Sequence, residues 1–398
     1  MAGTLSGARL RALLLVAPLA AFIGVTFLAP LGSMLVRSVH DPVVADALPE
    51  TLAQLRSWNG SGTPPEEVFA AAARELVAAR EQRTLGQVAT RVNRVQAGLR
   101  SVFTRSVRRL RGAETDSWAT TMTAADAAWG EAATWRALQR AGQRWTLRHY
   151  LNAVDRDRAP DGSIVRQPEE RRIYLQLFGR TLLVSLAVTG LCLVLGYPLA
   201  YLIAHAPPRR AGLLLVGVLL PFWTSLLVRT TAWIVLLQTQ GVINDLLVGL
   251  GIIGDEQRLA MVYNMTGTLV AMTHVLLPFM VLSLYSVMRG IGPQYLRAAA
   301  SLGAGPVQAF RRVYWPLSLP GVGAGALLVF IVALGYYITP ALVGGRSGQL
   351  ISNLIAYHMQ ESLNWGLAAA LGAILLLCVL MFYVVYDRVV GIGRLRLG

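Results

Sequence analysis

Six apolar runs, each long enough to cross a lipid bilayer as a helix, constrain the fold of this 398-residue chain more than any other feature. A membrane-spanning helix needs about 20 apolar residues. Hydrophobic residues make up 55% of the sequence and charged residues only 14%, a balance far from that of an ordinary soluble domain. We therefore expect an all-α membrane protein with six transmembrane helices, at residues 12–36, 181–204, 211–237, 265–288, 317–343 and 365–386.

The first run follows two arginines, as the apolar core of a secretory signal peptide does. Its uncharged stretch covers residues 12–36, whereas the core of a signal peptide is about 7–15 residues long. We therefore expect a retained membrane span rather than a cleaved signal.

Charged residues fall unevenly on the two sides of the expected spans. The short loops of one side hold Arg258 and Arg346 against four acids (Asp245, Asp255, Glu256 and Glu361). The other side holds one acid, Asp387, against eleven arginines: Arg9, Arg11, Arg209, Arg210, Arg289, Arg297, Arg311, Arg312, Arg388, Arg394 and Arg396. Because cytoplasmic loops are enriched in basic residues, we expect both termini in the cytoplasm.

The basic residues also exclude several functions. All 36 are arginine, so the chain has no lysine for a phosphate-binding loop of the GxxxxGK[ST] type, and we expect no ATP hydrolysis by this chain. The positive-inside bias accounts for the net charge of +15, so we expect no nucleic-acid partner. Cys192 and Cys378 both lie in apolar runs; we expect no disulfide, metal site, cofactor or catalytic residue.

Residues 37–172 differ from the rest of the chain. They contain 21 arginines, 16 acids and five tryptophans, and they follow the first span, so we expect them outside the cytoplasm. Six apolar residues at spacings of three and four predict a helical stripe, and Pro64 and Pro65 before two glutamates predict a helix start. The stripe comprises Leu85, Val88, Val92, Val95, Leu99 and Val102. We expect a small helical domain; the alternative is a loosely ordered linker.

A basic segment rich in alanine and glycine, residues 295–321, separates the fourth and fifth runs. Ala298 and Ala299 suit a short helix that another protein approaches closely, and Gly303 suits a sharp turn out of that helix. Pro316 and Pro320 are expected to stop the chain and redirect it into the fifth span. The segment resembles the coupling loop of ABC importer permeases, with Arg297 where the family usually has glutamate.

The resemblance extends from about residue 145 to the end of the chain. LGYPLAYLIA (195–204), PFWTSLLVRTTAW (221–233), LQTQGVIN (237–244) and LLPFMVLSLYSVM (276–288) are similar to the first permease subunit of spermidine/putrescine ABC importers. This resemblance implies the type I ABC importer permease fold and a bacterial inner-membrane location. It also implies two copies of an ATP-binding subunit, a second permease subunit and an external solute-binding protein as partners, with membrane lipid around the chain.

The permease would then comprise residues 1–36 (cytoplasmic N-terminus and first span), an outward helical insert at 37–172, and a five-helix core at 173–398 with its coupling loop at 289–316. The substrate would be a small solute such as a polyamine. An ion-coupled secondary transporter and a membrane-anchored receptor are the alternatives. For the insert, we expect a docking platform for the solute-binding protein.

Several residues of the expected spans are candidates for the substrate path. Arg229 is the only charge deep in an expected span, where an unpaired charge is costly. It either lines the path or extends toward the membrane surface. The aromatic rings either offer faces to an alkyl amine or form an interfacial belt, and His274 is expected to be a buried hydrogen-bonding residue. The path candidates are Trp223, Thr224, Arg229, Trp233, Tyr336 and Tyr337. No acid falls within the expected spans, which is unusual for a path that selects cations.

Overall fold

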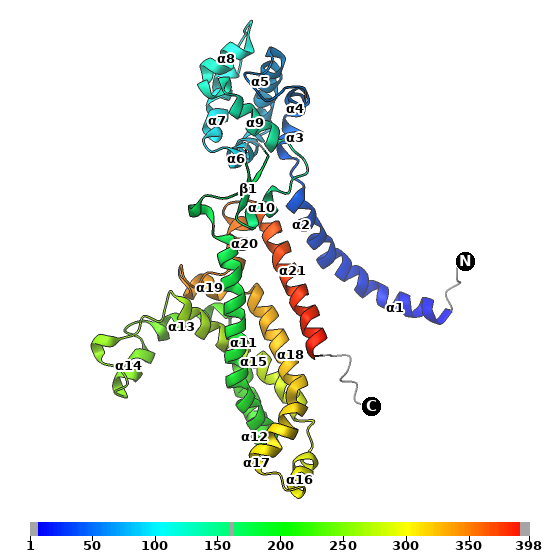
Figure 1. Ribbon diagram of the computed structural model, residues 1–398, viewed down its shortest axis with the longest axis vertical. Coiled ribbons are helices and arrows are strands. Elements are labelled where there is room, and N and C mark those ends of the chain that lie inside the picture. The colour runs from blue at the N-terminus through cyan, green and yellow to red at the C-terminus, as the bar shows by residue number, and fades with distance from the viewer. Residues whose placement is uncertain (1–6, 160–161, 391–398) are drawn as a thin grey trace. The chain divides into compact units, whose positions relative to one another are not determined.

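The computed structural model describes residues 7–159 and 162–390 (Figure 1). Arg394 and Arg396, counted above for the topology, lie outside these residues. The chain forms two compact units, Met1–Tyr150 (unit 1) and Leu151–Gly398 (unit 2). Within the described part, six helical stretches have the length and composition of membrane spans: Leu14–Val39, Tyr174–His205, Leu226–Gly249, Met265–Met288, Pro306–Gly335 and Trp365–Arg388. The mostly helical fold and the number of candidate spans agree with the sequence.

Unit 1 begins with the first candidate span and continues into a helical bundle. The span is made of α1 (Gly7–Ile23), the π-helical turn η1 (Gly24–Leu28) and α2 (Ala29–Val39). The bundle consists of α3 (Val43–Ala47), α4 (Pro49–Leu55), α5 (Glu66–Glu81), α6 (Leu85–Val95), α7 (Leu99–Leu110), α8 (Trp118–Ala125), η2 (Ala127–Gly130) and α9 (Ala132–Ala141). Helix α10 (Arg148–Ala153) crosses the boundary between the units.

The predicted features of the bundle are present, with one break. Helix α5 starts directly after Pro65, and Glu66 and Glu67 occupy its first turn, where negative charge is favourable. The apolar stripe points inward but is divided between α6 and α7, because Gly98 between them has φ = 94°, a left-handed conformation that glycine adopts readily.

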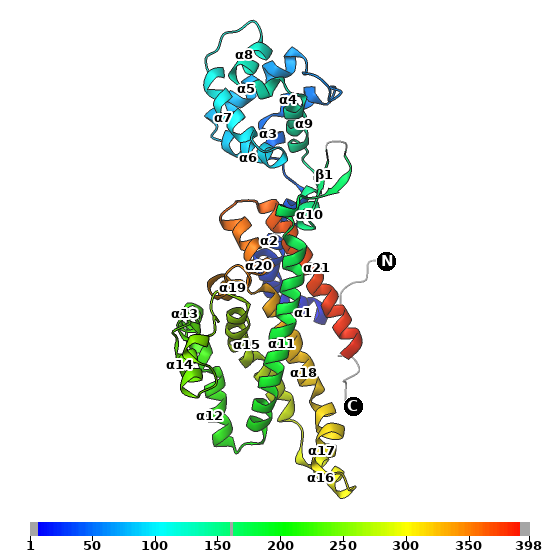
Figure 2. The same ribbon diagram turned by 60° about the vertical axis from the view of Figure 1, so that its left-hand side comes forward.

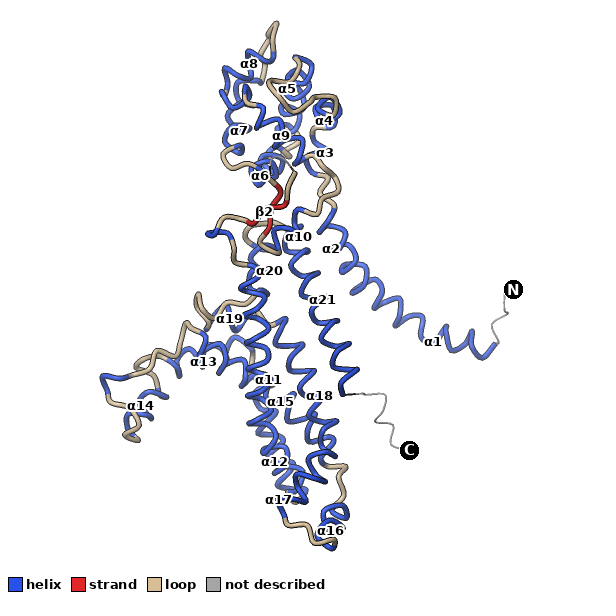
Figure 3. The backbone as a smooth tube through the Cα atoms, in the orientation of Figure 1, coloured by secondary structure: helices blue, strands red, loops and turns tan. Residues whose placement is uncertain are grey.

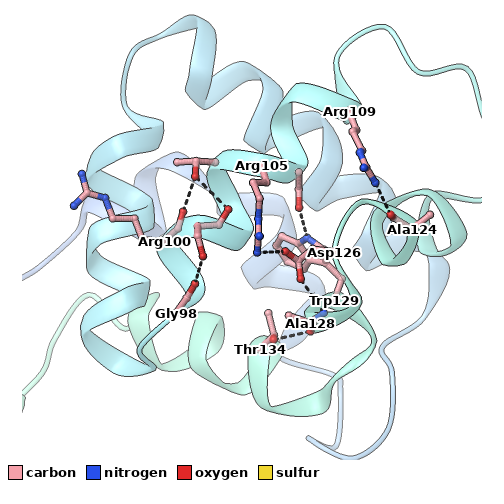
Figure 4. Close-up of polar contacts among 12 residues, drawn as sticks. Gly98, Arg100, Arg105, Arg109, Ala124, Asp126, Ala128, Trp129 and Thr134 are labelled. Atoms are coloured by element: carbon pink, nitrogen blue, oxygen red, sulfur yellow. Dashed lines mark hydrogen bonds and ion pairs between the residues drawn. The ribbon is translucent and has the colours of Figure 1, made fainter.

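The core of the bundle is aromatic, and Figure 4 shows Trp129 among the side chains that make polar contacts around it. The rings of Phe69 and Trp135 lie 4.7 Å apart, those of Phe103 and Trp129 5.1 Å, and those of the two tryptophans 5.2 Å. Both indole N–H groups find acceptors: Trp129 donates to Ser106 Oγ and Trp135 to the carbonyl of Trp129, each at 2.8 Å. A fully satisfied aromatic core of this kind supports a folded domain in water.

Unit 2 contains the other five candidate spans. A short hairpin of β1 (Arg156–Arg158) and β2 (Ile164–Arg166), which the sequence did not predict, precedes them (Figure 3). The remaining elements are η3 (Glu169–Arg171), α11 (Tyr174–His205), α12 (Pro208–Leu219), η4 (Leu220–Trp223), α13 (Leu226–Leu237), α14 (Val242–Gly249), η5 (Asp255–Gln257), α15 (Met265–Met288), α16 (Pro293–Ser301), α17 (Pro306–Ala309), η6 (Phe310–Tyr314), α18 (Trp315–Gly335), α19 (Ile338–Val343), α20 (Ile351–Gln360) and α21 (Trp365–Val390).

Helices α11, α15 and α18 pack together as the centre of unit 2 (Figure 2). Their contacts depend on small residues. A Cβ on Gly196 would lie 3.1 Å from Met280, one on Gly325 2.7 Å from the Met280 sulfur, and one on Gly321 3.0 Å from Val287. Close approach through glycine is the usual way in which membrane helices gain packing energy, since lipid supplies no hydrophobic driving force between them.

The expected third span, residues 211–237, is not one helix. Pro221 has no N–H to continue α12, and Ser225 starts α13 by accepting the N–H of Val228 at 3.1 Å. The third candidate span is instead Leu226–Gly249, which includes Asp245. Asp245, which the sequence predicts in a short loop, falls within this stretch, after the turn that separates α13 from α14. The Asp245 carboxylate pairs with Arg258 at 2.7 Å.

Candidate functional site

Helix α16 carries the residues expected for a coupling loop. Gly292 precedes it and Pro293 occupies its first turn, which suits the fixed φ of proline. At its other end Gly303 has φ = 86°. The Gly303 N–H donates to the carbonyl of Ala300 at 2.9 Å, and the Ala304 N–H donates to that of Ala299 at 3.0 Å. These two bonds form a Schellman motif, so the chain leaves the helix at Gly303, as its sequence position predicts.

One face of α16 packs on unit 2 and the other is exposed. Ala299 is buried and Leu296 packs against the core of unit 2. Arg297 and Ala298 are exposed. Leu302, in the turn after the helix, exposes 89% of its surface. Such an exposed leucine outside the spans marks an interaction surface when other apolar side chains accompany it.

The accompanying apolar residues are Tyr295 on α16 and Val307 on α17, both exposed. Sequence reasoning missed them together with Leu302, although the contrast of apolar residues within a basic loop was visible. Figures 1 and 2 both place α16 and α17 at the end of unit 2 where α11 is joined to α12. We call Tyr295, Arg297, Ala298, Leu302 and Val307 the α16 surface.

Pro316 and Pro320 do not stop the chain, contrary to the expectation from sequence. Both lie in the continuous helical stretch Pro306–Gly335. The π-helical turn η6 precedes them, and in it the N–H of Trp315 donates to the carbonyl of Phe310, five residues back. The wider turn moves backbone carbonyls away from the ring of Pro316, so that the helix can continue past the proline. The helical stretch that leads into α18 therefore begins at Pro306, within the expected loop 289–316.

A polar cluster joins α13 and α15, which lie in candidate spans, to the residues that directly follow α18. The indole N–H of Trp233 donates to Nδ1 of His274 at 3.1 Å, so His274 is the hydrogen-bonding residue that the sequence predicts. Thr230 and Thr339 place their hydroxyl oxygens 3.4 Å apart in the same region. The structure therefore joins residues that are 41 and 109 positions apart in sequence.

Arg229 belongs to this cluster. It lies on α13, four residues before Trp233 and next to Thr230. Its Nε and Nη1 atoms are buried, and neither has a hydrogen-bond partner among the residues that the structure describes. A buried guanidinium without an acceptor costs several kcal/mol as an order of magnitude, which makes Arg229 a candidate for a contact with a bound partner. We call Arg229, Trp233, His274, Tyr336 and Thr339 the intramembrane cluster.

The other path candidates lie outside the intramembrane cluster. Trp223 exposes 77% of its surface and Tyr337 is also exposed, while the Thr224 hydroxyl donates to the carbonyl of Pro221 at 2.9 Å. The expected fifth span, residues 317–343, ends earlier, because the chain leaves the helix at Tyr336 with ψ = 125°. In the described part of the chain, no group of three or more His, Cys, Asp and Glu residues could hold a metal ion.

The C-terminal half of the sequence matches a known family. Residues 193–391 match the model of the binding-protein-dependent transport system inner membrane component. The chain is 36% identical to the spermidine/putrescine transport system permease protein PotB of Haemophilus influenzae, over 54% of this chain and 75% of that protein. It is 35% identical to the same permease of Escherichia coli, over 54% and 78%.

Among solved structures, a bacterial ABC transporter involved in the import of the acidic polysaccharide alginate matches with a TM-score of 0.44 and 18% identity, over 58% of this chain and 81% of that chain. The family match includes α16, α13, α15 and α18, and thus both the α16 surface and the intramembrane cluster. The chain belongs to the binding-protein-dependent transport family, as a multi-pass, non-catalytic inner-membrane permease subunit of an ABC importer.

Proposed function

We propose that this permease moves a polyamine-like solute into the cytoplasm by alternating access, driven by a separate ATPase. In this proposal the chain has the type I ABC importer permease fold, pairs with a second permease subunit and rests on two copies of the ATP-binding subunit. Both termini face the cytoplasm and the helical insert faces outward. The observation that carries the proposal is the α16 surface, a group of exposed residues on and directly after a short helix, within the residues that match the family.

The α16 surface suits a groove on a partner ATPase. Ala298 presents only a methyl group, so that the partner's backbone can come close, and Leu302 supplies an apolar side chain to bury. The Schellman turn at Gly303 and the buried Ala299 fix the helix to unit 2. Closure of two ATPase subunits would then move α16 as a rigid body and transmit the motion to α15 and α18.

The nature of the solute rests on the two relatives reported above, both of which are named spermidine/putrescine permeases. The rings of Trp233 and Tyr336 offer faces to an ammonium group. The charge of Arg229 opposes a polycation, so we assign Arg229 a different role. Its buried Nε and Nη1 atoms receive an acceptor from the second permease subunit and hold the two subunits together around the path.

The role of Arg229 is tested by co-purification of the two permease subunits. Arg229→Gln is expected to reduce recovery of the second permease about tenfold or more, because it removes a charge-assisted contact worth roughly 2–5 kcal/mol. Arg346→Gln, at an exposed arginine of unit 2, is the control and should leave recovery unchanged. Normal pairing of Arg229→Gln with unchanged uptake would refute the assignment.

The proposed function is tested by purifying the full chain in mild detergent and identifying its partners by mass spectrometry. We expect an ATPase, a second six-span permease and spermidine-stimulated ATP hydrolysis in the reconstituted complex. Recovery of the ATPase with stimulation by another solute would refute only the polyamine assignment. Repeated recovery without an ATPase would refute the coupling mechanism.

We further propose that the bundle of unit 1 is a docking platform for the solute-binding protein. Its two ends meet, since the Asp41 N–H donates to the carbonyl of Arg144 at 2.9 Å and the Thr146 N–H to that of Val39 at 2.8 Å. Residues 43–141 can therefore be replaced by a short glycine linker without moving either end. Weaker binding of the solute-binding protein after this replacement would support the platform, and unchanged binding would refute it.

A further inference from the structure

A small cavity in unit 1 is lined by an excess of positive charge. Its volume is about 30 Å³, enough for one small group. Arg91 Nε lies 3.1 Å from Asp41 Oδ2, and each side chain is only 20% exposed. Arg148 donates to the main-chain carbonyl of Arg94. Together with Arg140, four arginines face one aspartate. Four positive charges less one negative charge leave a local charge of +3.

Burial keeps this charge poorly solvated. It lowers the pKa of Arg94 to about 10, and the neighbouring charge of Arg91 adds to the effect. Burial also lowers the pKa of His149 to about 4, against the opposing influence of Asp41, so His149 is neutral at pH 7 and contributes a hydrogen-bonding ring rather than a further charge. Positive groups held together with so little water attract an anion strongly.

The cavity lies directly after the first membrane span. Asp41 follows the end of α2 at Val39 by two residues, and the backbone bonds from Asp41 and Thr146 tie the opposite cavity wall to that helix end. The span Leu14–Val39 has 26 residues. At about 1.5 Å per residue it is roughly 39 Å long, which exceeds the hydrocarbon core of about 30 Å. Val39 therefore reaches the layer of lipid headgroups.

The surroundings of the cavity favour an amphiphile over a free ion. A second cavity of about 590 Å³ shares Arg140 and Gln143 with the first. Its lining combines an apolar wall that includes Leu52 with two further arginines, Arg56 and Arg144. Gly142 allows Leu52 to pack directly against the backbone, since a Cβ at position 142 would lie 2.4 Å from a Leu52 methyl. Trp145, which lines this cavity, exposes 67% of its surface, and tryptophan is enriched at membrane interfaces. Leu147, two residues later, exposes 64%.

We propose that Arg91, Arg94, Arg140, Arg148 and His149, which we call the basic pocket, bind the phosphate headgroup of an anionic membrane phospholipid. The phosphate lies against the guanidinium groups as their counter-charge. The glycerol and upper acyl carbons lie along the apolar wall near Leu52 and beside Trp145 and Leu147. A bound lipid would fix the bundle of unit 1 to the membrane surface at the end of its own span.

The test is native mass spectrometry of the full chain from mixed micelles of phosphatidylglycerol and phosphatidylcholine. The wild-type chain should retain phosphatidylglycerol preferentially. Arg94→Gln with Arg148→Gln should lower that preference about tenfold, since charge-assisted hydrogen bonds are lost. Arg94→Lys with Arg148→Lys keeps the charge and should retain most of it. Arg105→Gln, at an exposed arginine that pairs with Asp126, is the matched control and should bind like wild type.

Two results would overturn the proposal. One is an equal lipid preference of the wild-type chain and the glutamine double variant when both show the same tryptophan fluorescence. The other is displacement of the bound lipid by millimolar inorganic phosphate, which would show a site for free anions. If the double variant does not fold, Arg140→Gln decides the question, because the same lipid preference as wild type would then contradict the proposal.

Discussion

The bundle of unit 1 and the central helices of unit 2 are built from the same kind of element but are held together differently. The bundle buries large aromatic rings, with Trp129 and Trp135 at its centre. The centre of unit 2 places Gly196, Gly321 and Gly325 where its helices meet, and exposes apolar side chains outward. The difference follows from the solvent. In water, burial of a large apolar area stabilises a fold, whereas in lipid the stabilisation comes from close van der Waals contact between helices.

The largest expected effect on stability comes from removing a ring of the aromatic core. Trp129→Ala should reduce the free energy of unfolding of unit 1 by about 3–5 kcal/mol, because it removes a large buried ring and leaves Ser106 without its partner. Thermal unfolding followed by tryptophan fluorescence measures this change. Trp145→Ala, at an exposed ring, should shift the transition little. Equal destabilisation by both variants would contradict the aromatic core as the basis of stability.

The next effect depends on pH and again concerns unit 1. Burial lowers the pKa of His149 to about 4, below its value of about 6.5 in the unfolded chain. The unfolded state therefore binds more protons between these values, and stability falls as the pH decreases from 6.5 to 4, by on the order of 3 kcal/mol. The groups that face His149 are Asp41, Arg91, Arg94 and Arg148.

His149→Gln should remove this part of the pH dependence. Denaturant unfolding of the wild-type chain and the variant at several pH values measures the difference between their slopes, so that the carboxylates common to both cancel. Parallel curves for the two proteins between pH 4 and 6.5 would show that His149 is solvated in the folded state.

A smaller effect is expected for the packing of the helices in unit 2. Gly325→Leu should destabilise the contact of α18 with α15 by about 1–3 kcal/mol through overpacking, because a Cβ there already lies 2.7 Å from the Met280 sulfur. Gly372→Leu in α21 has no atom within 4 Å of the new Cβ and serves as the control. Thermal melting in detergent should separate the two variants, and similar melting would argue against glycine-mediated packing.

The smallest effect concerns surface charge. Arg105 and Asp126 form an ion pair at 2.7 Å, with Arg105 largely exposed. Such pairs contribute about 0–1 kcal/mol, so Arg105→Ala should hardly change the unfolding midpoint of unit 1 in denaturant. A loss as large as that of Trp129→Ala would mean that polar contacts, rather than the aromatic core, hold the bundle.

Sequence patterns predicted the features that depend on local composition. The candidate span Met265–Met288 begins and ends where its hydropathy predicts, and Gly303 turns the chain where a left-handed residue was needed. The helix start at Pro65 follows the same logic. In each case a residue and its near neighbours determine the outcome, because transfer energy and backbone sterics act locally.

The remaining features depend on contacts that composition does not specify. Pro221 and Ser225 divide the expected third span. Both residue types are known helix-boundary signals, but the high mean hydropathy of residues 211–237 led us to expect one continuous helix. Pro316 was expected to break a helix, but a π-helical turn accommodates it. The contact of Trp233 with His274 spans 41 residues and requires the packing of α13 on α15, which a single sequence does not reveal.

The most direct test of the central claim compares two glycines with the same backbone requirement. Gly303 and Gly112 both have positive φ, 86° and 74°, and nothing lies near either Cβ position. Valine at either site should introduce a strain of about 1–3 kcal/mol. The measurement is solute-stimulated ATP hydrolysis by the reconstituted importer. If α16 couples this permease to its ATPase, Gly303→Val abolishes stimulation and Gly112→Val preserves it. Full stimulation by a membrane-inserted Gly303→Val chain would contradict the account.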